Sequence, residues 1–293
     1  MQIPTFKDQL QLVDLGLARV SKNENLWTFK YKSDVMYKNK WKESEFLMEC
    51  RGHTYDATTG ELKVLPFRKS FNYGENGWWE DVDLNTPVVM YKKYNGFMAA
   101  VTNDVVSTTG TTNSDFVSMA KEYVNNVVVP NTFTHLYEIN HTLDQHIVEE
   151  EVGAKLLGIR YNKTGAYYPK GQQIKCTLKQ ALGIAKHDRG EGYMIYTLDK
   201  DFDPTIKINT EYFCKVKSDR YRARKALIRM HNNAARVLFS TKFNGFQGKT
   251  LLPNIFKTYF NMVCWKYTAE DWINFTSKER FDILTELEQR WGF

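Results

Sequence analysis

Residues 87–101 read Pro87-Val-Val-Met-Tyr-Lys-Lys-Tyr-Asn-Gly-Phe-Met-Ala-Ala-Val101. Two runs of apolar, β-branched and aromatic residues flank a short segment that carries two lysines and ends in a glycine. Such runs are typical of β-strands, and the following Asn103-Asp104 pair predicts a turn before Val105-Val106. This part of the chain therefore predicts antiparallel strands joined in hairpins.

Helical patterns lie on either side of these strands. Residues 114–124, opened by a serine cap, and residues 177–186 have the apolar spacing of helices. Beyond residue 221 the strand signals fade, and helices follow that are separated by a loop at 244–250. The last helix opens with a capping box at 276–279 and places four apolar residues on one face: Phe281, Leu284, Leu287 and Trp291. The sequence predicts an α+β body with antiparallel sheets and flanking helices over residues 1–221, followed by a small all-α domain over residues 222–293.

The composition excludes several classes of protein. The 293 residues are 42% hydrophobic and 25% charged, which is unlike disordered or collagen-like chains. No apolar run approaches the roughly 18 residues of a membrane span, and the first residues lack a secretory signal, so we expect a cytoplasmic protein that does not cross a membrane. The net charge of +6 is compatible with a polyanionic partner. Four widely spaced cysteines are expected to be free thiols: Cys50, Cys176, Cys214 and Cys264.

Lysines at strand ends are the first candidates for catalytic or phosphate-binding residues. In Lys93-Tyr-Asn-Gly96 the glycine permits a close backbone approach beside a lysine amine, which suits a phosphate. An ordinary surface lysine before a turn is the alternative. Lys215 and Lys217 alternate along a strand, so their amines share one face and repel each other unless an anion lies between them. The alternative is an edge strand that lysines protect from aggregation.

Isolated charges in other short segments are further candidates. Glu138 and Glu191 each interrupt a strand-like run, where a carboxylate is costly unless it is paired or near a metal. A solvent-facing position on a half-buried strand is the alternative for each. Arg51 and Lys69 add cations in two more segments, and these could equally be ordinary surface charges.

The order of these pieces along the chain is more specific than any one of them. Between about residues 29 and 221 the sequence contains Arg51-Gly, Lys69-x-Phe-Asn, Lys93-x-x-Gly, Tyr-Glu138, Glu191-Gly-Tyr and Lys215-x-Lys217-Ser-Asp-x-Tyr. In this order it resembles the ATP-dependent RNA ligase 1 family of T-even-type phages. That family belongs to the lysine nucleotidyltransferases, together with DNA ligases and mRNA capping enzymes. Glu49-Cys-Arg-Gly and residues 215–221 are its most family-specific pieces.

The resemblance implies that residues 1–221 are an adenylyltransferase domain with Lys93 as the nucleophile that attacks the α-phosphorus of ATP. Lys215 and Lys217 would hold the α-phosphate. A lysine with an ordinary pKa of about 10.4 is protonated near neutrality. We therefore expect crowding by Lys215, Lys217 and a metal ion to lower the pKa of Lys93.

The resemblance also implies roles for the remaining candidates. Arg51 and Lys69 match positions that grip the outgoing phosphates, Glu138 matches the glutamate that contacts the ribose, and Glu191 matches one that helps to place the metal. Mg²⁺, with Mn²⁺ as the alternative, would be bound by Glu191 and Glu138 through water, as Mg²⁺ prefers. Tyr31 resembles an aromatic residue near the nucleotide, and Leu157 would flank the adenine.

The implied activity is the joining of 5′-phosphate and 3′-hydroxyl ends of single-stranded RNA, such as cleaved tRNA, through lysine–AMP and RNA–adenylate intermediates. We expect a phage-encoded monomer in the cytoplasm of the infected host cell. A DNA ligase or a capping enzyme is an alternative, although these normally add an OB-fold where this sequence predicts helices. A ligase-like protein that binds nucleic acid without catalysis is another.

The sequence departs from the family in several places. Asn95 stands where the family has an aspartate, Phe97 replaces a small hydroxyl residue, and residues 107–111 replace a segment that carries lysines in the T-even enzymes. A longer hairpin is expected at 199–204. Residues 215–231 hold seven Lys or Arg against one Asp, which suits a track for the RNA backbone or a solvated helix face.

Overall fold

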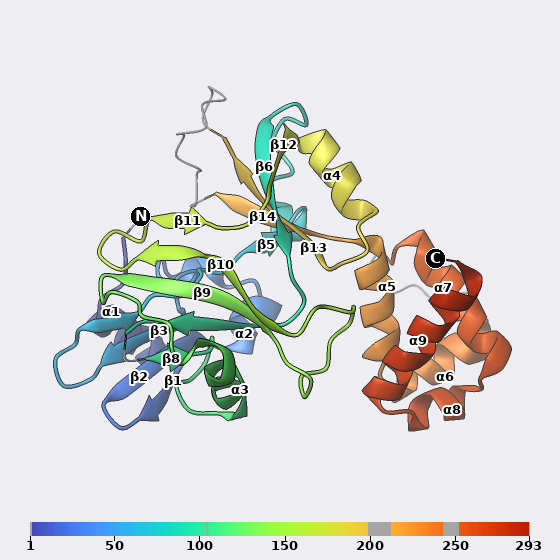
Figure 1. Cartoon of the computed structure of the whole chain (residues 1–293), viewed down its shortest axis with the longest axis horizontal. Helices are drawn as coiled ribbons and strands as arrows, with labels where there is room; N and C mark the ends of the chain where they lie inside the picture. Colours follow the sequence, from blue (N-terminus) through green and yellow to red (C-terminus); the bar gives the residue numbers. More distant parts are fainter. Residues whose placement is uncertain (1, 104, 199–211, 243–251, 293) are drawn as a thin grey trace.

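The computed structural model describes residues 2–103, 105–198, 212–242 and 252–292. Within these ranges the chain forms three β-sheets, antiparallel except for one strand pair, with helices packed beside them (Figure 1). The predicted α+β fold class is confirmed. The hairpin expected at 199–204 and the loop expected at 244–250 lie outside the described residues.

The first sheet is built from the N-terminal part of the chain. It has four strands in the order β1-β2-β3-β4, with bounds Ala18–Asn23, Leu26–Tyr31, Arg51–Asp56 and Leu62–Val64. Helix α1 (Phe6–Asp14), which opens with a capping box at Thr5, packs its Phe6 ring against Trp27, Phe29 and Tyr55 of this sheet. Two short helices, α2 (Ser33–Tyr37) and η1 (Trp41–Glu43), lie between β2 and β3.

The second sheet has the strand order β11-β10-β9-β7-β8. Its strands are β7 (Phe97–Val101), β8 (Val106–Ser107), β9 (Phe133–Asn140), β10 (Gly153–Tyr161) and β11 (Tyr167–Pro169). The predicted helix at 114–124 is confirmed as α3 (Asp115–Val124), capped by Ser114, and it packs its buried face against this sheet.

The third sheet has the strand order β12-β6-β13-β14-β5. Its strands are β5 (Phe71–Asn72), β6 (Pro87–Lys93), β12 (Gln173–Thr177), β13 (Gly192–Thr197) and β14 (Phe213–Lys217), with η2 (Glu75–Gly77) following β5. Among the strand pairs that the structure describes, only the short pairing of β14 with β5 is parallel. The predicted helix at 177–186 is confirmed as α4 (Leu178–Lys186), which covers one face of this sheet.

Strands β6 and β7 do not form a hairpin, so the expected pairing of these two runs is wrong. The strands belong to different sheets, and the chain crosses from one to the other at residues 94–96. Gly96 permits the crossing, because a Cβ atom at this position would lie 2.2 Å from the carbonyl oxygen of Ile139 in β9. Strands β7 and β8, which lie on either side of the predicted turn, do pair antiparallel, although Asp104 of that turn lies outside the described residues.

The described residues that follow Lys217 form helices, which lie at the right of Figure 1. They are α5 (Asp219–Ile228), α6 (Asn232–Thr241), α7 (Asn254–Lys266), α8 (Ala269–Asn274) and α9 (Ser277–Trp291). They share a hydrophobic core that also takes in Ile147 and Val148 from the segment after β9. A separate domain over residues 222–293 stays a prediction.

The predicted apolar face of the last helix is confirmed only in part. The capping box at Thr276 is present, Leu284 and Leu287 are buried, and Phe281 packs against the same core. Trp291 is 55% exposed because it occupies the last turn of α9, beside the Gly292 cap.

Two smaller expectations concern thiols and membranes. The four cysteines are free, with Cys50 and Cys214 buried and the other two partly buried. In the described ranges, no helix combines the length and apolar character needed to span a bilayer.

Candidate active site

A buried carboxylate lies between two lysines at the centre of the third sheet. Glu191 Oε2 is 3.0 Å from Lys93 Nζ, and Glu191 Oε1 is 3.0 Å from Lys217 Nζ. Strand register explains this arrangement, since Gly192 in β13 lies opposite both Lys93 in β6 and Lys217 in β14. The residue just before Gly192 therefore reaches both amines. Glu191 is 3% exposed, so the alternative of a solvent-facing glutamate is wrong.

Two small residues hold this arrangement in place. Gly192 has φ +131°, and a Cβ atom there would lie 2.0 Å from the Val216 carbonyl oxygen, so only glycine fits. The Ser218 hydroxyl donates to the Gly190 carbonyl (2.7 Å), and the Ser218 amide donates to the Glu191 carbonyl (3.0 Å). The same hydroxyl accepts from the Tyr221 amide and caps α5. The end of β14 is thus tied to Glu191 just where α5 begins.

Asn95 fixes the carboxylate from the other side. Its Oδ1 accepts from the backbone amides of Ile147 (2.7 Å) and Val148 (3.2 Å), and its Nδ2 donates to Glu191 Oε2 at 3.5 Å. The two amide donors determine which way the side chain points. An aspartate here would place a carboxylate oxygen against Glu191 instead of a donor, which gives a physical reason for asparagine in this chain.

Glu138 lies on the neighbouring sheet and is also buried, at 8% exposure. Its Oε1 accepts from the Gly96 amide at 2.9 Å, which links β9 to the crossing segment after Lys93. The glycine of Lys93-x-x-Gly96 therefore supplies a donor as well as space.

The pKa of Lys93 is raised by the residues of the site alone, whereas we expected Lys215, Lys217 and a metal ion together to lower it. Burial opposes the charge on Lys93, but Glu191 and Glu138 together outweigh burial and favour the ammonium form. In turn, the two lysines hold the pKa of Glu191 below its ordinary value despite its burial. Lys93 carries a proton in this arrangement.

The lowered pKa belongs to Lys215 instead. Burial, followed by the charges of Lys69 and Lys217, lowers the pKa of Lys215 to about 7. Its Nζ donates to the Ser70 carbonyl at 3.0 Å. Crowded cations of this kind are stabilised by a bound anion, which makes the space beside Lys215 suitable for a phosphate.

Lys69 is buried on the same side of the site. Its Nζ lies 3.3 Å from Glu75 Oε1 and 4.5 Å from the centre of the Phe71 ring. Sequence reasoning missed Glu75. The signal was its place three residues after Asn72, since Glu75 accepts from the Asn72 amide at 2.8 Å and orders the turn that follows β5.

A cavity with aromatic walls adjoins these charges. Leu157 lines it from a β-bulge in β10, a device that re-aims a side chain. Arg51 lines it from the start of β3, where its Nη1 donates to the Phe67 carbonyl at 3.4 Å. The other lining residues include Lys93, Glu138, Met98 and six aromatic residues: Phe67, Tyr91, Tyr94, Tyr167, Tyr196 and Phe213. Apolar walls with a few charged groups at one side suit a flat base joined to phosphates.

Tyr31 lies behind this site. Its ring packs edge-on against Trp41 with the centroids 4.9 Å apart, and Trp41 in turn lies 5.4 Å from Lys69 Nζ. The structure thus brings together eight of the nine predicted site residues and places Tyr31 one layer further back.

Glu49 explains why Glu49-Cys-Arg51-Gly is a unit. Burial alone would raise the pKa of Glu49, but Arg160 and His53 lower it to about 2. Glu49 Oε2 lies 3.0 Å from Arg160 Nη2 in β10, and both residues are buried. This ion pair anchors the start of β3, and with it Arg51, to the second sheet. Sequence reasoning quoted Glu49 without giving it this role, because its partner is distant in the sequence.

The basic stretch at 215–231 has fewer cations available to bind RNA than expected. Arg220 and Arg224 both pair with Glu288 in α9, and Arg224 is fully buried. The prediction of a track for the RNA backbone is therefore wrong for Arg220 and Arg224, because their charges hold α5 and α9 together.

The carboxylates of Glu191 and Glu138 fit a divalent metal ion that keeps much of its bound water. Among the described residues, no group of three His, Cys, Asp or Glu side chains could enclose a metal. Glu191 and Glu138 instead offer two carboxylates beside a space suited to phosphate, which is the donor set that Mg²⁺ usually takes.

Comparisons with known proteins give structural likenesses only. No family model matches the chain, and no curated protein matches its sequence. Two forms of an archaeal ATP-dependent RNA ligase superpose with TM-scores of 0.45 and 0.49, each at 13% identity and covering 97% of this chain and 76% of theirs. A putative ATP-dependent DNA ligase from Aquifex aeolicus gives 0.45 at 12% identity, covering 88% and 71%.

Proposed function

We propose that this chain is an ATP-dependent RNA ligase that works through a covalent lysine–AMP intermediate on Lys93. The observation that carries the proposal is the Glu191 carboxylate between Lys93 and Lys217, with Lys215 beside them. This arrangement supplies a nucleophilic amine, a group that can accept its proton and two cations for a phosphate.

In the first step, Lys93 Nζ attacks the α-phosphorus of ATP. A nitrogen–phosphorus bond forms, the bond to the β-phosphate oxygen breaks, and pyrophosphate leaves. Since the pKa of Lys93 is raised, the amine must first lose a proton, and Glu191 Oε2 at 3.0 Å is the acceptor that the geometry provides. Asn95 keeps that oxygen in place by donating to it.

The other residues bind and position the nucleotide. Lys215 and Lys217 stabilise the charge that develops on the α-phosphate. Arg51 and Lys69 hold the departing phosphates, Glu138 binds the ribose, and Leu157 flanks the adenine. Glu191 and Glu138 would hold Mg²⁺, or Mn²⁺, which when bound supplies positive charge against the phosphate oxygens.

The later steps transfer AMP to a 5′-phosphate end and then expel it when a 3′-hydroxyl attacks. The polynucleotide is single-stranded RNA, with cleaved tRNA as a candidate, and the enzyme acts as a monomer. Residues 1–221 form the adenylyltransferase domain, and residues 222–293 form a helical domain.

Separate assays of the two halves of the reaction test this proposal. Lys93→Ala should abolish transfer of AMP from ATP to the protein but still seal RNA that carries a chemically added 5′-adenylate. Lys175→Ala is the matched control, because this exposed lysine lies on β12 of the same sheet and does not line the cavity that contains Lys93. Normal adenylation by Lys93→Ala would overturn the assignment.

The same assay identifies the substrates. Sealing should occur on pre-adenylated single-stranded RNA and not on a nicked DNA duplex. Sealing of DNA alone would move the assignment to a DNA ligase, and label from GTP alone would move it to a capping-type enzyme.

A further inference from the structure

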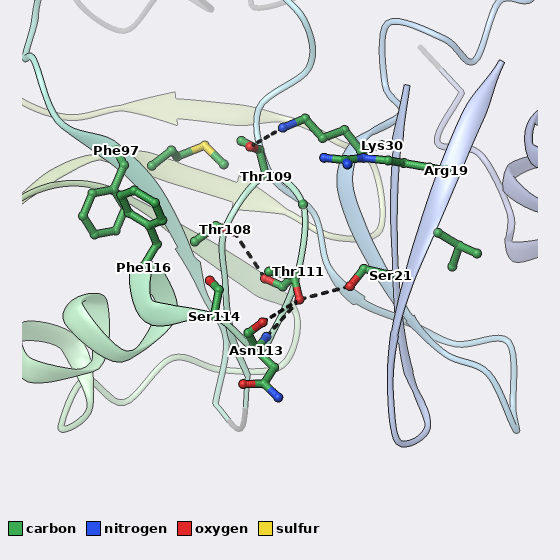
Figure 2. A pocket seen from close by; sticks show the side chains of 13 residues that line it. Arg19, Ser21, Lys30, Phe97, Thr108, Thr109, Thr111, Asn113, Ser114 and Phe116 are labelled. Atoms are coloured by element: carbon green, nitrogen blue, oxygen red, sulfur yellow. Dashed lines mark hydrogen bonds between the residues drawn. The ribbon is translucent and has the colours of Figure 1, made fainter. Parts of the chain in front are cut away.

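A groove of about 710 Å³ lies beside the proposed active site, between the first sheet and helix α3. Met98 lines both this groove and the cavity that contains Lys93, so the two spaces adjoin. Figure 2 shows its two walls, with Lys30 and Arg19 on one side, Phe97 and Phe116 on the other, and threonines of the 108–111 loop between them.

The first wall carries two cations, Arg19 and Lys30, and Arg51 of the adjoining cavity continues their row. Arg19 in β1 lies opposite Lys30 in β2, and Lys30 lies opposite Arg51 in β3. Side chains directly opposite on antiparallel strands have Cβ atoms about 4.5–5.5 Å apart, and like charges there are destabilising. Among the residues that the structure describes, none of these three cations forms an ion pair with a carboxylate. A row of this kind is stabilised by an anion.

The 108–111 loop, between the two walls, brings hydroxyl groups and backbone close to Arg19 and Lys30. Lys30 Nζ donates to Thr109 Oγ1 at 3.1 Å, and Ser21 Oγ donates to Thr111 Oγ1 at 3.1 Å. A Cβ atom on Gly110 would lie 3.8 Å from Arg19 Nη2 and 3.9 Å from Lys30 Nζ, so both cations converge on this glycine. Burial, Arg51 and Arg19 lower the pKa of Lys30, as expected for a cation that lacks its counter-ion.

The second wall is aromatic. Phe97, which follows Gly96, and Phe116 in α3 pack edge-to-face with their ring centroids 4.8 Å apart. Phe116 is 44% exposed, so it can accept another flat group. Cations along one side and an exposed ring on the other are the two features with which proteins bind single-stranded nucleic acid.

We propose that this groove binds single-stranded RNA next to the reacting end, with backbone phosphates on Arg19 and Lys30 and a base stacked on Phe116. The inference rests on the proposed function, since it assigns the path of the polynucleotide to the Lys93 site. It also gives the 107–111 loop and Phe97, which depart from the family pattern, a place in substrate binding.

Binding of a short fluorescent single-stranded RNA with a 5′-phosphate, measured across a range of salt concentrations, tests the proposal. Lys30→Gln and Arg19→Gln should each weaken binding several-fold and reduce the slope of log K against log salt by about 0.7, the value for one lost phosphate contact. Phe116→Ala should weaken binding by about tenfold, as loss of one stacked base would, with the salt slope unchanged. Lys22→Gln is the matched control, since this exposed lysine of β1 lies over Trp27 and does not line the groove.

ATP-dependent labelling of the same variants separates the groove from the nucleotide site. Each variant should form lysine–AMP with the wild-type dependence on ATP concentration. If Lys30→Gln needs a higher ATP concentration to form lysine–AMP but binds RNA normally, the groove holds the triphosphate and the proposal is wrong. Equal RNA binding by all variants and the control would also overturn it. Failure of the wild-type protein to form lysine–AMP would count against the proposed function, while the RNA-binding comparison would still decide the groove.

Discussion

The charge of Lys215, in the proposed active site, lowers the free energy of unfolding. Its pKa falls from 10.5 in the unfolded chain to about 7 in the folded protein, because of burial and the charges of Lys69 and Lys217. Between these two values the unfolded state binds more protons, so the free energy of unfolding rises with pH from about 7 to about 10.5. Well below pH 7 Lys215 is charged in both states, and the folded state carries the full cost of that charge.

The variant Lys215→Met should therefore be more stable than the wild type at pH 6, by roughly 1–4 kcal/mol, although it loses the phosphate contact. Its advantage should shrink as pH increases above 7. Urea unfolding at several pH values measures this difference, and a difference that stays constant with pH would contradict the account of Lys215.

At this scale the sequence predicted which residues gather, but not all of their electrostatics. Lys93, Glu191 and Lys217 meet as expected. The raised pKa of Lys93 was not predicted, because the sequence gives no distances and the two nearest carboxylates outweigh burial and the charge of Arg51. Glu75 and Arg160 were missed as partners for the same reason.

Strand β3 and the 107–111 loop illustrate how elements constrain each other. Gly52 has φ +100°, and a Cβ atom there would lie 2.9 Å from the backbone Cα of Thr109. Gly171 has a similar φ of +109° but nothing within 4 Å, which makes it a matched control.

Both glycines should lose stability on substitution by alanine, but by different amounts. Gly171→Ala should cost about 1 kcal/mol from backbone strain alone. Gly52→Ala should cost at least about 1 kcal/mol more, because the loop backbone must move. Urea denaturation compares the two variants, and equal losses would show that the loop does not pack on Gly52 as described.

Most elements near these residues were predictable from local pattern. The helices at 115–124 and 178–186 carry their caps and apolar spacing in the sequence. The crossing between β6 and β7 was not predictable, because the approach of Gly96 to Ile139 depends on the position of β9, a strand distant in sequence.

Across the whole molecule, hydrogen bonds connect the C-terminal helices to the proposed catalytic lysine. Glu288 in α9 pairs with Arg224 in α5, and Arg224 Nε donates to the Ile147 carbonyl at 2.8 Å. The Ile147 amide donates to Asn95, which donates to Glu191. The helices therefore support the segment that orients the carboxylate, and they were not expected from sequence to reach the site.

Removing the charge of Glu288 should lower the free energy of unfolding far more than removing the charge of an exposed glutamate in α9. Glu288→Gln leaves the fully buried Arg224 without its anion and should cost about 3–5 kcal/mol. Glu286→Gln, which only loses a surface contact to Lys266 at 3.4 Å, should cost at most about 1 kcal/mol. Thermal and urea unfolding measure both variants, and similar small losses would contradict the role given to Glu288.

The most direct test of the proposed function is to incubate the purified, nucleotide-free protein with α-labelled ATP and magnesium, denature it, and map the labelled peptide. The label should remain covalently attached at Lys93, should come from ATP and not from GTP, and should be released by added pyrophosphate. A folded protein that takes no label from either nucleotide, or that carries the label on another lysine, would contradict the assignment of Lys93 as the nucleophile.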